Sequence, residues 1–134
     1  NRLNIFEAAL WERVQGILTS FKMILAYPWG VGLKHFTLYL QDFSSNFLAP
    51  WEFQPVHNFY LLFANELGVI ASLILIFYLV QTWLKSKQWQ KPILFTCFFL
   101  GFFDHYLWTN HSAQLFFLMF LLTVVEKKKE NHNK

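Results

Sequence analysis

One long apolar stretch, residues 59–83, constrains the fold of this chain more than any other feature. It contains a single acidic residue, Glu66, about two turns after its start. A helix of about 25 residues is roughly 37 Å long, which is enough to cross a bilayer with some tilt. Ionisable groups at membrane depth are costly and usually face other helices or a wet cavity. We therefore predict a transmembrane helix over 59–83, and we expect Glu66 to face another helix.

The composition agrees with a membrane protein. Hydrophobic residues make up 55% of the 134 residues and charged residues only 14%, which is too few to cover a soluble domain of this size. The lone Cys97 excludes an intramolecular disulfide and, by itself, a cysteine-rich metal site. The chain begins with Asn and shows no signal peptide. We expect it to be the C-terminal part of a longer polytopic protein.

Two further apolar stretches, residues 92–108 and 111–125, predict two more spans. Both are near the lower length limit for crossing a bilayer. A tight polar turn at Thr109, Asn110 and His111 joins them. The predicted fold class is therefore all-α, a polytopic membrane helical bundle in which three C-terminal transmembrane helices follow an outward-facing amphipathic helix and loop.

The N-terminal residues 1–27 have apolar side chains at helical spacing, with polar side chains over much of the other side. This pattern predicts an amphipathic helix at the membrane interface or against other helices. Pro28 ends the helix, the segment that follows is typical of a turn, and residues 33–56 are expected to be irregular. We therefore divide the chain into an extracytoplasmic helix and loop (1–58), three transmembrane helices (59–125) and a basic cytoplasmic tail without regular structure (126–134).

The lysines predict the orientation. The 84–91 segment contains Lys85, Lys87 and Lys91 and no acid, and the tail is also rich in lysine. Cytoplasmic segments carry an excess of Lys and Arg, so both segments are assigned to the cytoplasmic side. Residues 1–58 and the 109–111 turn must then face outward. This topology brings polar side chains from three separate segments to the outer face, namely His57, Asp104, His105, Asn110 and His111.

Each of these residues also has a purely structural interpretation. Asn58 is a favourable helix N-cap, and His57 could be a hydrated imidazole at the interface. Asp104 and His105 could form a structural hydrogen bond. Arg13, on an amphipathic helix, could be solvated or contact lipid phosphates.

Metal and cofactor sites are not predicted. A zinc site from His57, His105 and His111 is conceivable, but no spacing along the sequence supports it. The Gly30-Val31-Gly32 segment lacks the third glycine and the strand–helix setting of a dinucleotide-binding loop. We therefore expect neither a metal ion nor a cofactor.

Several short motifs follow one another in a defined order along the chain. Arg13 is followed by a helix ending at Tyr27-Pro28, by Gly30-Val31-Gly32, by "HNFYL" from His57, and by "NELG" from Asn65. This series resembles the C-terminal half of the O-antigen ligase / O-antigen polymerase family of bacterial membrane proteins, over essentially all of residues 10–125. The loop between the "GVG" motif and His57 is shorter than in many ligases, which suggests a different acceptor.

The resemblance implies a glycosyltransferase of the bacterial cytoplasmic (inner) membrane. Its donor would be a glycan on undecaprenyl pyrophosphate. Its acceptor would be a hydroxyl group on a lipid A core, on another glycan repeat unit or on a protein side chain. The reaction would take place on the extracytoplasmic side, in contact with membrane lipid, with inversion at the anomeric carbon and without metal, nucleotide sugar or nucleic acid.

The residue chemistry suggests roles within that reaction. Histidine is the natural base for an acceptor hydroxyl, because free imidazole titrates near neutral pH. Arg13 presents a planar fork of donors that suits pyrophosphate oxygens. His57 and Arg13 are therefore the predicted catalytic residues, and Glu66 is a supporting residue. The predicted substrate-binding residues are Asn58, Asp104, His105 and His111.

Two other interpretations remain open. A non-catalytic polytopic membrane protein, such as a transporter segment, would place polar residues along a path across the bilayer. Here they gather near one face, apart from Glu66, which argues against a path. A purely structural helical bundle leaves the outward polar cluster unexplained. Within the resembled family, the sequence does not separate ligase, polymerase and protein glycosyltransferase.

Overall fold

The computed structural model describes residues 2–44 and 53–130, with side chains described for residues 7, 9–44 and 53–122. All the secondary structure of these residues is helical, so the all-α prediction is confirmed. Predictions for residues 45–52 and 131–134 lie outside the described residues. The helices are α1 (Arg2–Ala26), α2 (Phe36–Phe43), α3 (Phe59–Lys85), α4 (Lys91–Leu100), α5 (Tyr106–Thr109) and α6 (His111–Glu130).

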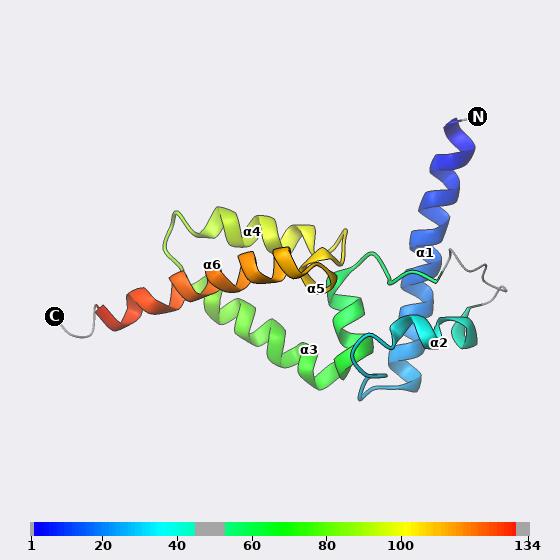
Figure 1. Ribbon diagram of the computed structural model, residues 1–134, viewed down its shortest axis with the longest axis horizontal. Coiled ribbons are helices and arrows are strands. Elements are labelled where there is room, and N and C mark those ends of the chain that lie inside the picture. The colour runs from blue at the N-terminus through cyan, green and yellow to red at the C-terminus, as the bar shows by residue number, and fades with distance from the viewer. Residues whose placement is uncertain (1, 45–52, 131–134) are drawn as a thin grey trace.

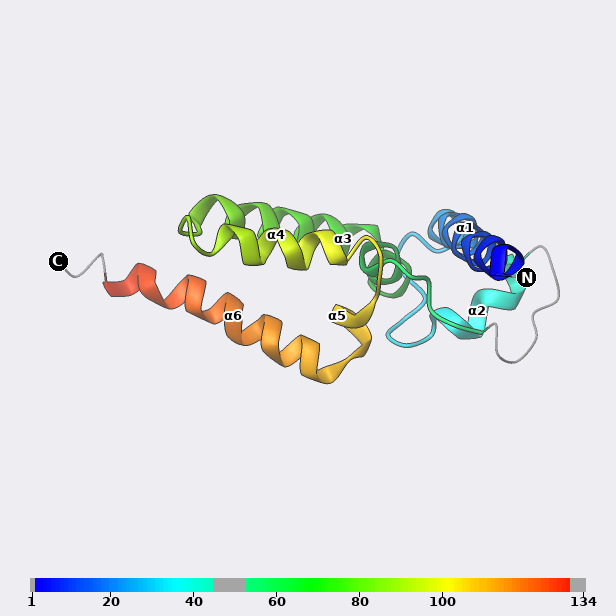
Figure 2. The same cartoon turned by 90° about the horizontal axis from the view of Figure 1, so that it is seen from above.

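The helices are arranged around α3. Figure 1 shows α1 and α2 at one end of the molecule and α4 and α6 at the other, with α3 running between the two groups. α3 bends sharply, and α4 returns from the far end of α3 towards its beginning. Figure 2 shows α6 in a separate layer from α3 and α4. The bend and the return helix together bring distant parts of the sequence to the start of α3.

Only α3 is long and apolar enough to cross a membrane among the described helices. α4 and residues 111–122 of α6 are shorter apolar segments. Large hydrophobic side chains are nevertheless exposed on all three of these helices, including Phe77, Phe95 and Phe116. Apolar patches of this kind mark surfaces that contact lipid or other apolar groups.

The 25-residue span expected from the sequence is not a straight helix. α3 is interrupted at Gly68, whose φ of 88° and ψ of 170° are non-helical. The longer arm, residues 69–85, has 17 residues and a length of about 25 Å at about 1.5 Å per residue. This arm is at the short end of the range that crosses a bilayer.

The interruption is built against the turn that follows α1. Val31 N–H donates to the Asn65 carbonyl at 2.8 Å, and Gly32 N–H donates to the Glu66 carbonyl at 3.0 Å. In return, Val69 N–H donates to the Pro28 carbonyl at 2.9 Å. Three backbone groups that the broken helix cannot pair internally are thereby satisfied, so the interruption carries no loss of backbone hydrogen bonding at these positions.

A small core joins α1, α2 and the start of α3. Its buried members are Met23, Phe36, Leu40, Val56 and Leu62. The expectation that residues 33–56 are irregular is wrong for residues 36–43, which form α2. The reason is that Phe36 and Leu40 share one helix face at i, i+4 spacing and are both buried in this core.

The predicted helix over 92–108 is also wrong as a continuous element. α4 ends at Leu100, and a turn precedes the short α5. Backbone carbonyls at the end of α4 accept hydrogen bonds from the beginning of α3: Gly101 O from Phe59 N–H at 2.8 Å, and Phe102 O from the Asn58 side chain at 3.1 Å. These donors stabilise the C-terminal end of α4, and nothing in the sequence near residue 100 predicts them.

The predicted turn at 109–111 is present. Asn110 Oδ1 accepts from the backbone N–H groups of Ser112 and Ala113, at 3.0 and 3.3 Å, and so caps α6. The tail was expected to lack regular structure from residue 126, but α6 continues to Glu130.

The crossing of the two backbones predicts which glycines tolerate a side chain. A Cβ at Gly68 would lie 2.5 Å from the Trp29 carbonyl carbon, and a Cβ at Gly30 would lie 2.5 Å from the Glu66 carbonyl oxygen. We expect Gly68→Ala and Gly30→Ala each to reduce the free energy of unfolding by about 3 kcal/mol or more, since steric overlap with backbone adds to the positive-φ strain. Unfolding of the detergent-solubilised protein, followed by circular dichroism, measures this effect.

Gly16 provides the matched control. Its added Cβ would meet only the Val56 side chain, at an ordinary 3.7 Å. Because Gly16 lies inside α1, Gly16→Ala should leave stability unchanged or raise it by about 0.5–1 kcal/mol. Equal loss of stability in Gly16→Ala and Gly68→Ala would contradict a specific backbone crossing.

Candidate functional site

The site begins where the chain enters α3. Asn58 is the N-cap of this helix, and its side chain accepts from Leu61 N–H at 2.9 Å. The predicted capping role is therefore confirmed. The same side chain donates to the Phe102 carbonyl, so it also ties the start of α3 to the segment after α4. This predicted substrate-binding residue thus uses both ends of its amide to hold the fold, and its contact with a substrate stays a prediction.

A second contact holds the two segments together. The Tyr60 hydroxyl donates to the Phe98 carbonyl at 2.9 Å, and its ring packs against Phe102 with ring centres 4.8 Å apart. Gly101 is buried beneath the Tyr60 ring. These contacts place the residues that follow α4 immediately beside His57.

His57, Asp104 and His105 meet at this position. The His57 and His105 rings stack with centres 5.3 Å apart and planes inclined by 27°. One ligand-type atom from each of the three side chains lies within 4.8 Å of the other two. The convergence expected from the predicted topology is thus present for these three residues, although 47 positions separate His57 from Asp104 in the sequence.

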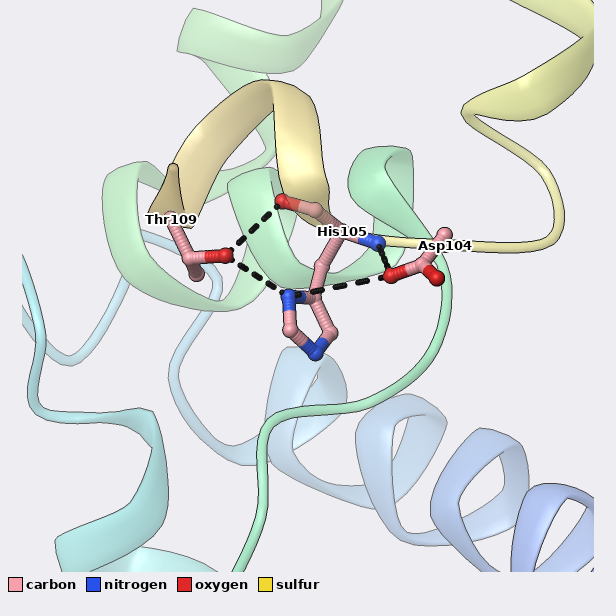
Figure 3. Close-up of polar contacts among 3 residues, drawn as sticks. All are labelled: Asp104, His105 and Thr109. Atoms are coloured by element: carbon pink, nitrogen blue, oxygen red, sulfur yellow. Dashed lines mark hydrogen bonds and ion pairs between the residues drawn. The ribbon is translucent and has the colours of Figure 1, made fainter. Parts of the chain in front are cut away.

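The His105 ring is held in place by its own neighbours, as Figure 3 shows. Its Nδ1 lies 2.9 Å from Thr109 Oγ1, which is a hydrogen bond one helical turn along the chain. Asp104 Oδ1 accepts from the His105 backbone N–H at 2.6 Å and lies 4.0 Å from His105 Nδ1. The carboxylate therefore fixes the backbone and remains near both imidazoles.

The electrostatics of the cluster favour a neutral His105. This residue lies in the turn between α4 and α5, outside α3. Burial lowers the pKa of its imidazole below the usual value, the Asp104 carboxylate opposes that shift, and His57 adds to it. Near neutral pH, His105 consequently offers a lone pair rather than a positive charge.

His57 has an unsatisfied polar atom. Its Nδ1 is buried and has no hydrogen-bond partner among the described residues. A buried polar atom without a partner costs about 1–3 kcal/mol, and such atoms in native proteins often have a functional explanation. The arrangement offers a base, a ligand for a cation, or a contact for a hydroxyl group of a substrate.

Glu66 joins α3 to the helix that follows the cluster. It is only 5% exposed, and its Oε2 accepts from the Trp108 indole N–H at 2.7 Å. The Trp108 ring packs edge-to-face on Phe63 and Phe59. The partner of Glu66 therefore lies in α5, so this bond anchors α5, and with it His105, to the bend of α3.

Of the predicted site residues, Arg13 and His111 make no contact with the cluster in the described part of the chain. The exposed Arg13 side chain makes no ion pair or hydrogen bond within the described part of the chain. However, α1 passes the site, since Gly16, one turn further along, faces Val56. His111 is exposed on the first turn of α6, where its Nδ1 lies 3.2 Å from Gln114 Oε1.

The sequence patterns do not single out Trp108 or Thr109. The spacing of four residues between His105 and Thr109 would place both on one helix face, which is a local signal for that pair. The Trp108–Glu66 contact spans 42 positions and has no local signal.

Comparison with known proteins identifies no relative. The chain matches no protein-family model, and no curated protein or solved structure shows significant similarity to it.

The Glu66–Trp108 hydrogen bond gives a testable prediction. Trp108→Phe keeps most of the aromatic packing but removes the only donor described for Glu66, so the free energy of unfolding should fall by about 1–3 kcal/mol. Trp89→Phe is the matched control, because Trp89 is 57% exposed and precedes α4, whereas the cluster follows the other end of that helix. Thermal unfolding in detergent compares the two variants, and an equal effect in both would contradict the anchoring role.

Proposed function

We propose that this chain takes part in the transfer of a glycan from undecaprenyl pyrophosphate to an acceptor hydroxyl on the outer face of the bacterial cytoplasmic membrane, as an O-antigen ligase or polymerase does. The observation that carries the proposal is the His57–Asp104–His105 cluster at the beginning of α3, the one described helix suited to cross a membrane. The motif order of the sequence, from Arg13 to the "NELG" segment, supports the same assignment.

The position of the cluster suits a lipid-linked donor. The cluster is at the start of α3, and Lys85 is at its end. If Lys85, Lys87 and Lys91 lie on the cytoplasmic side, His57 lies on the extracytoplasmic side. In this proposal α3 crosses the bilayer, and α4 and α6 belong to the other two predicted spans, with their exposed phenylalanines towards lipid.

His57 acts as the general base in the proposed reaction. The acceptor oxygen forms the new bond to the anomeric carbon, and its proton passes to His57. The bond between the anomeric carbon and the pyrophosphate oxygen breaks, and its electron pair leaves with undecaprenyl pyrophosphate. The Asp104 carboxylate stabilises the resulting imidazolium, and His105, held by Thr109, fixes the ring position.

Arg13 completes the proposed chemistry by holding the pyrophosphate. Its exposed guanidinium is accessible to a ligand, and α1 runs past the segment that leads into His57. A bidentate guanidinium stabilises the charge that develops on the leaving group.

A transporter segment is the alternative, and the interruption of α3 is the observation that favours it. Broken helices in transporters expose backbone carbonyls to ions. Here the carbonyls of Asn65 and Glu66 already accept from the turn after α1, through the N–H groups of residues 31 and 32. Each of these carbonyls therefore already has one partner and has less capacity for a passing ion, so glycan transfer remains the better supported function.

The decisive experiment is His57→Ala in the native host, with the protein level checked by immunoblot. Loss of a general base should reduce transfer by about 10²–10⁴-fold. The lipid-linked glycan should then accumulate, as measured by mass spectrometry of the lipid extract, and the surface conjugate should disappear. The conjugate that disappears identifies the acceptor class.

His35→Ala is the matched control, since His35 is exposed and lies outside the cluster. It should leave both glycan pools unchanged. An unchanged lipid pool and surface glycan in His57→Ala, at normal protein level, would contradict the proposed function.

A further inference from the structure

We propose that His57, Asp104 and His105 form a binding site for a divalent transition-metal ion of the Zn²⁺ class. Spacing along the chain does not indicate such a site, because two of the ligands follow each other directly and the third is 47 positions before them. Only the return of α4 to the start of α3 brings them together. The site differs from the conceivable His57–His105–His111 set, since Asp104 takes the place of His111.

The donor set is appropriate for such an ion. Two imidazoles and a carboxylate are the ligands of many zinc sites that keep a fourth position open for water or another small ligand. Zn²⁺ binds neutral imidazole, carboxylate and thiolate, whereas Mg²⁺ prefers oxygen ligands and retains its water. A site with two nitrogen ligands therefore selects against Mg²⁺.

The geometry is close to what the ion needs. Two imidazoles bound to one tetrahedral Zn²⁺ at roughly 2.0–2.1 Å have ring centres about 5 Å apart. The observed separation of the ring centres is 5.3 Å. The three ligand atoms lie within 4.8 Å of one another, and a tetrahedral ion needs them about 3.4 Å apart. The side chains must therefore rotate so that these atoms come closer together when the ion binds.

Outer contacts support the site in the manner of known metal centres. A metal-bound histidine usually forms a second hydrogen bond through its other ring nitrogen, which orients the ring. His105 Nδ1 is bonded to Thr109, which leaves Nε2 to bind the ion in this proposal, and Figure 3 shows Nε2 directed away from Thr109. A metal ion bound at His57 Nδ1 would also supply the partner that this buried atom lacks among the described residues.

Metal binding has a consequence that rests on the proposed function. An imidazole whose lone pair is bound to Zn²⁺ cannot accept a proton through that nitrogen. The base and metal roles of the cluster therefore compete, and Zn²⁺ should inhibit glycan transfer. Metal binding itself is measured without any turnover, so the two ideas are tested separately.

The test is titration of the purified, detergent-solubilised protein with Co²⁺ near neutral pH, since tetrahedral Co²⁺ absorbs strongly in the visible region. One Co²⁺ should bind per chain, Zn²⁺ should displace it, and Mg²⁺ should not. His105→Ala and His57→Ala should abolish the visible bands. Thr109→Val should weaken binding by about 10-fold or more, because it removes the bond that orients His105.

Asp104→Asn and His111→Ala make the result specific. In Asp104→Asn, the amide oxygen of the new side chain can still accept the backbone bond of His105. The fold is then kept while the charged ligand is lost, and binding should fall. His111→Ala should bind Co²⁺ like the wild type. Circular dichroism checks folding of every variant.

Absence of Co²⁺ binding by the wild-type protein would overturn the inference, as would binding that survives in both His57→Ala and His105→Ala. If Co²⁺ fails to bind while transfer still depends on His57, the metal site is wrong and the proposed function stands. If Co²⁺ binds but Zn²⁺ leaves transfer unaffected, the metal site stands and the base assignment is wrong.

Discussion

The structure depends on one crossing of two backbone segments. The turn after α1 and the interruption of α3 exchange three backbone hydrogen bonds across a gap too small for side chains. Gly30, Gly32 and Gly68 all have positive φ, and Gly30 and Gly68 face backbone atoms of the other segment directly. Without this crossing α3 would continue straight, and its first turns would separate from α1 and α2.

The bend determines where α4 ends. Because α3 changes direction at Gly68, α4 can return from its far end and meet its first residues. Asn58, Phe59 and Tyr60 then bond to the carbonyls at the end of α4. Glu66, two residues before the bend, bonds to Trp108 in α5. These contacts from the beginning of α3 bring the two histidines together, and the local bond to Thr109 orients the His105 ring.

Sequence patterns predict the parts of this fold that are local. Apolar periodicity indicates α1, the long apolar run indicates α3, and Asn58 is recognisable as a cap. The alternating direction of successive helices also predicts that Asp104 and His105 lie near His57. These predictions succeed because each depends on neighbouring residues or on the direction of successive helices.

The parts of the fold that the sequence does not predict depend on distant partners. The end of α4 is stabilised by Phe59, far earlier in the chain, and α2 forms around Phe36 and Leu40, whose burial depends on α1 and α3. Trp108 supports the site through a bond to Glu66, 42 positions earlier, whereas the His105–Thr109 bond is local and has a helical spacing.

The interruption of α3 also bears on how a helix of this kind would enter a membrane. Unpaired backbone carbonyls are costly in the hydrocarbon region, by several kcal/mol each. The groups that pair with Asn65 and Glu66 belong to residues 31 and 32, which are synthesised earlier because translation proceeds from the N-terminus. When the interrupted helix emerges, its backbone partners already exist. The turn after α1 is made before α3, so the carbonyls at the interruption can be paired as soon as α3 meets lipid.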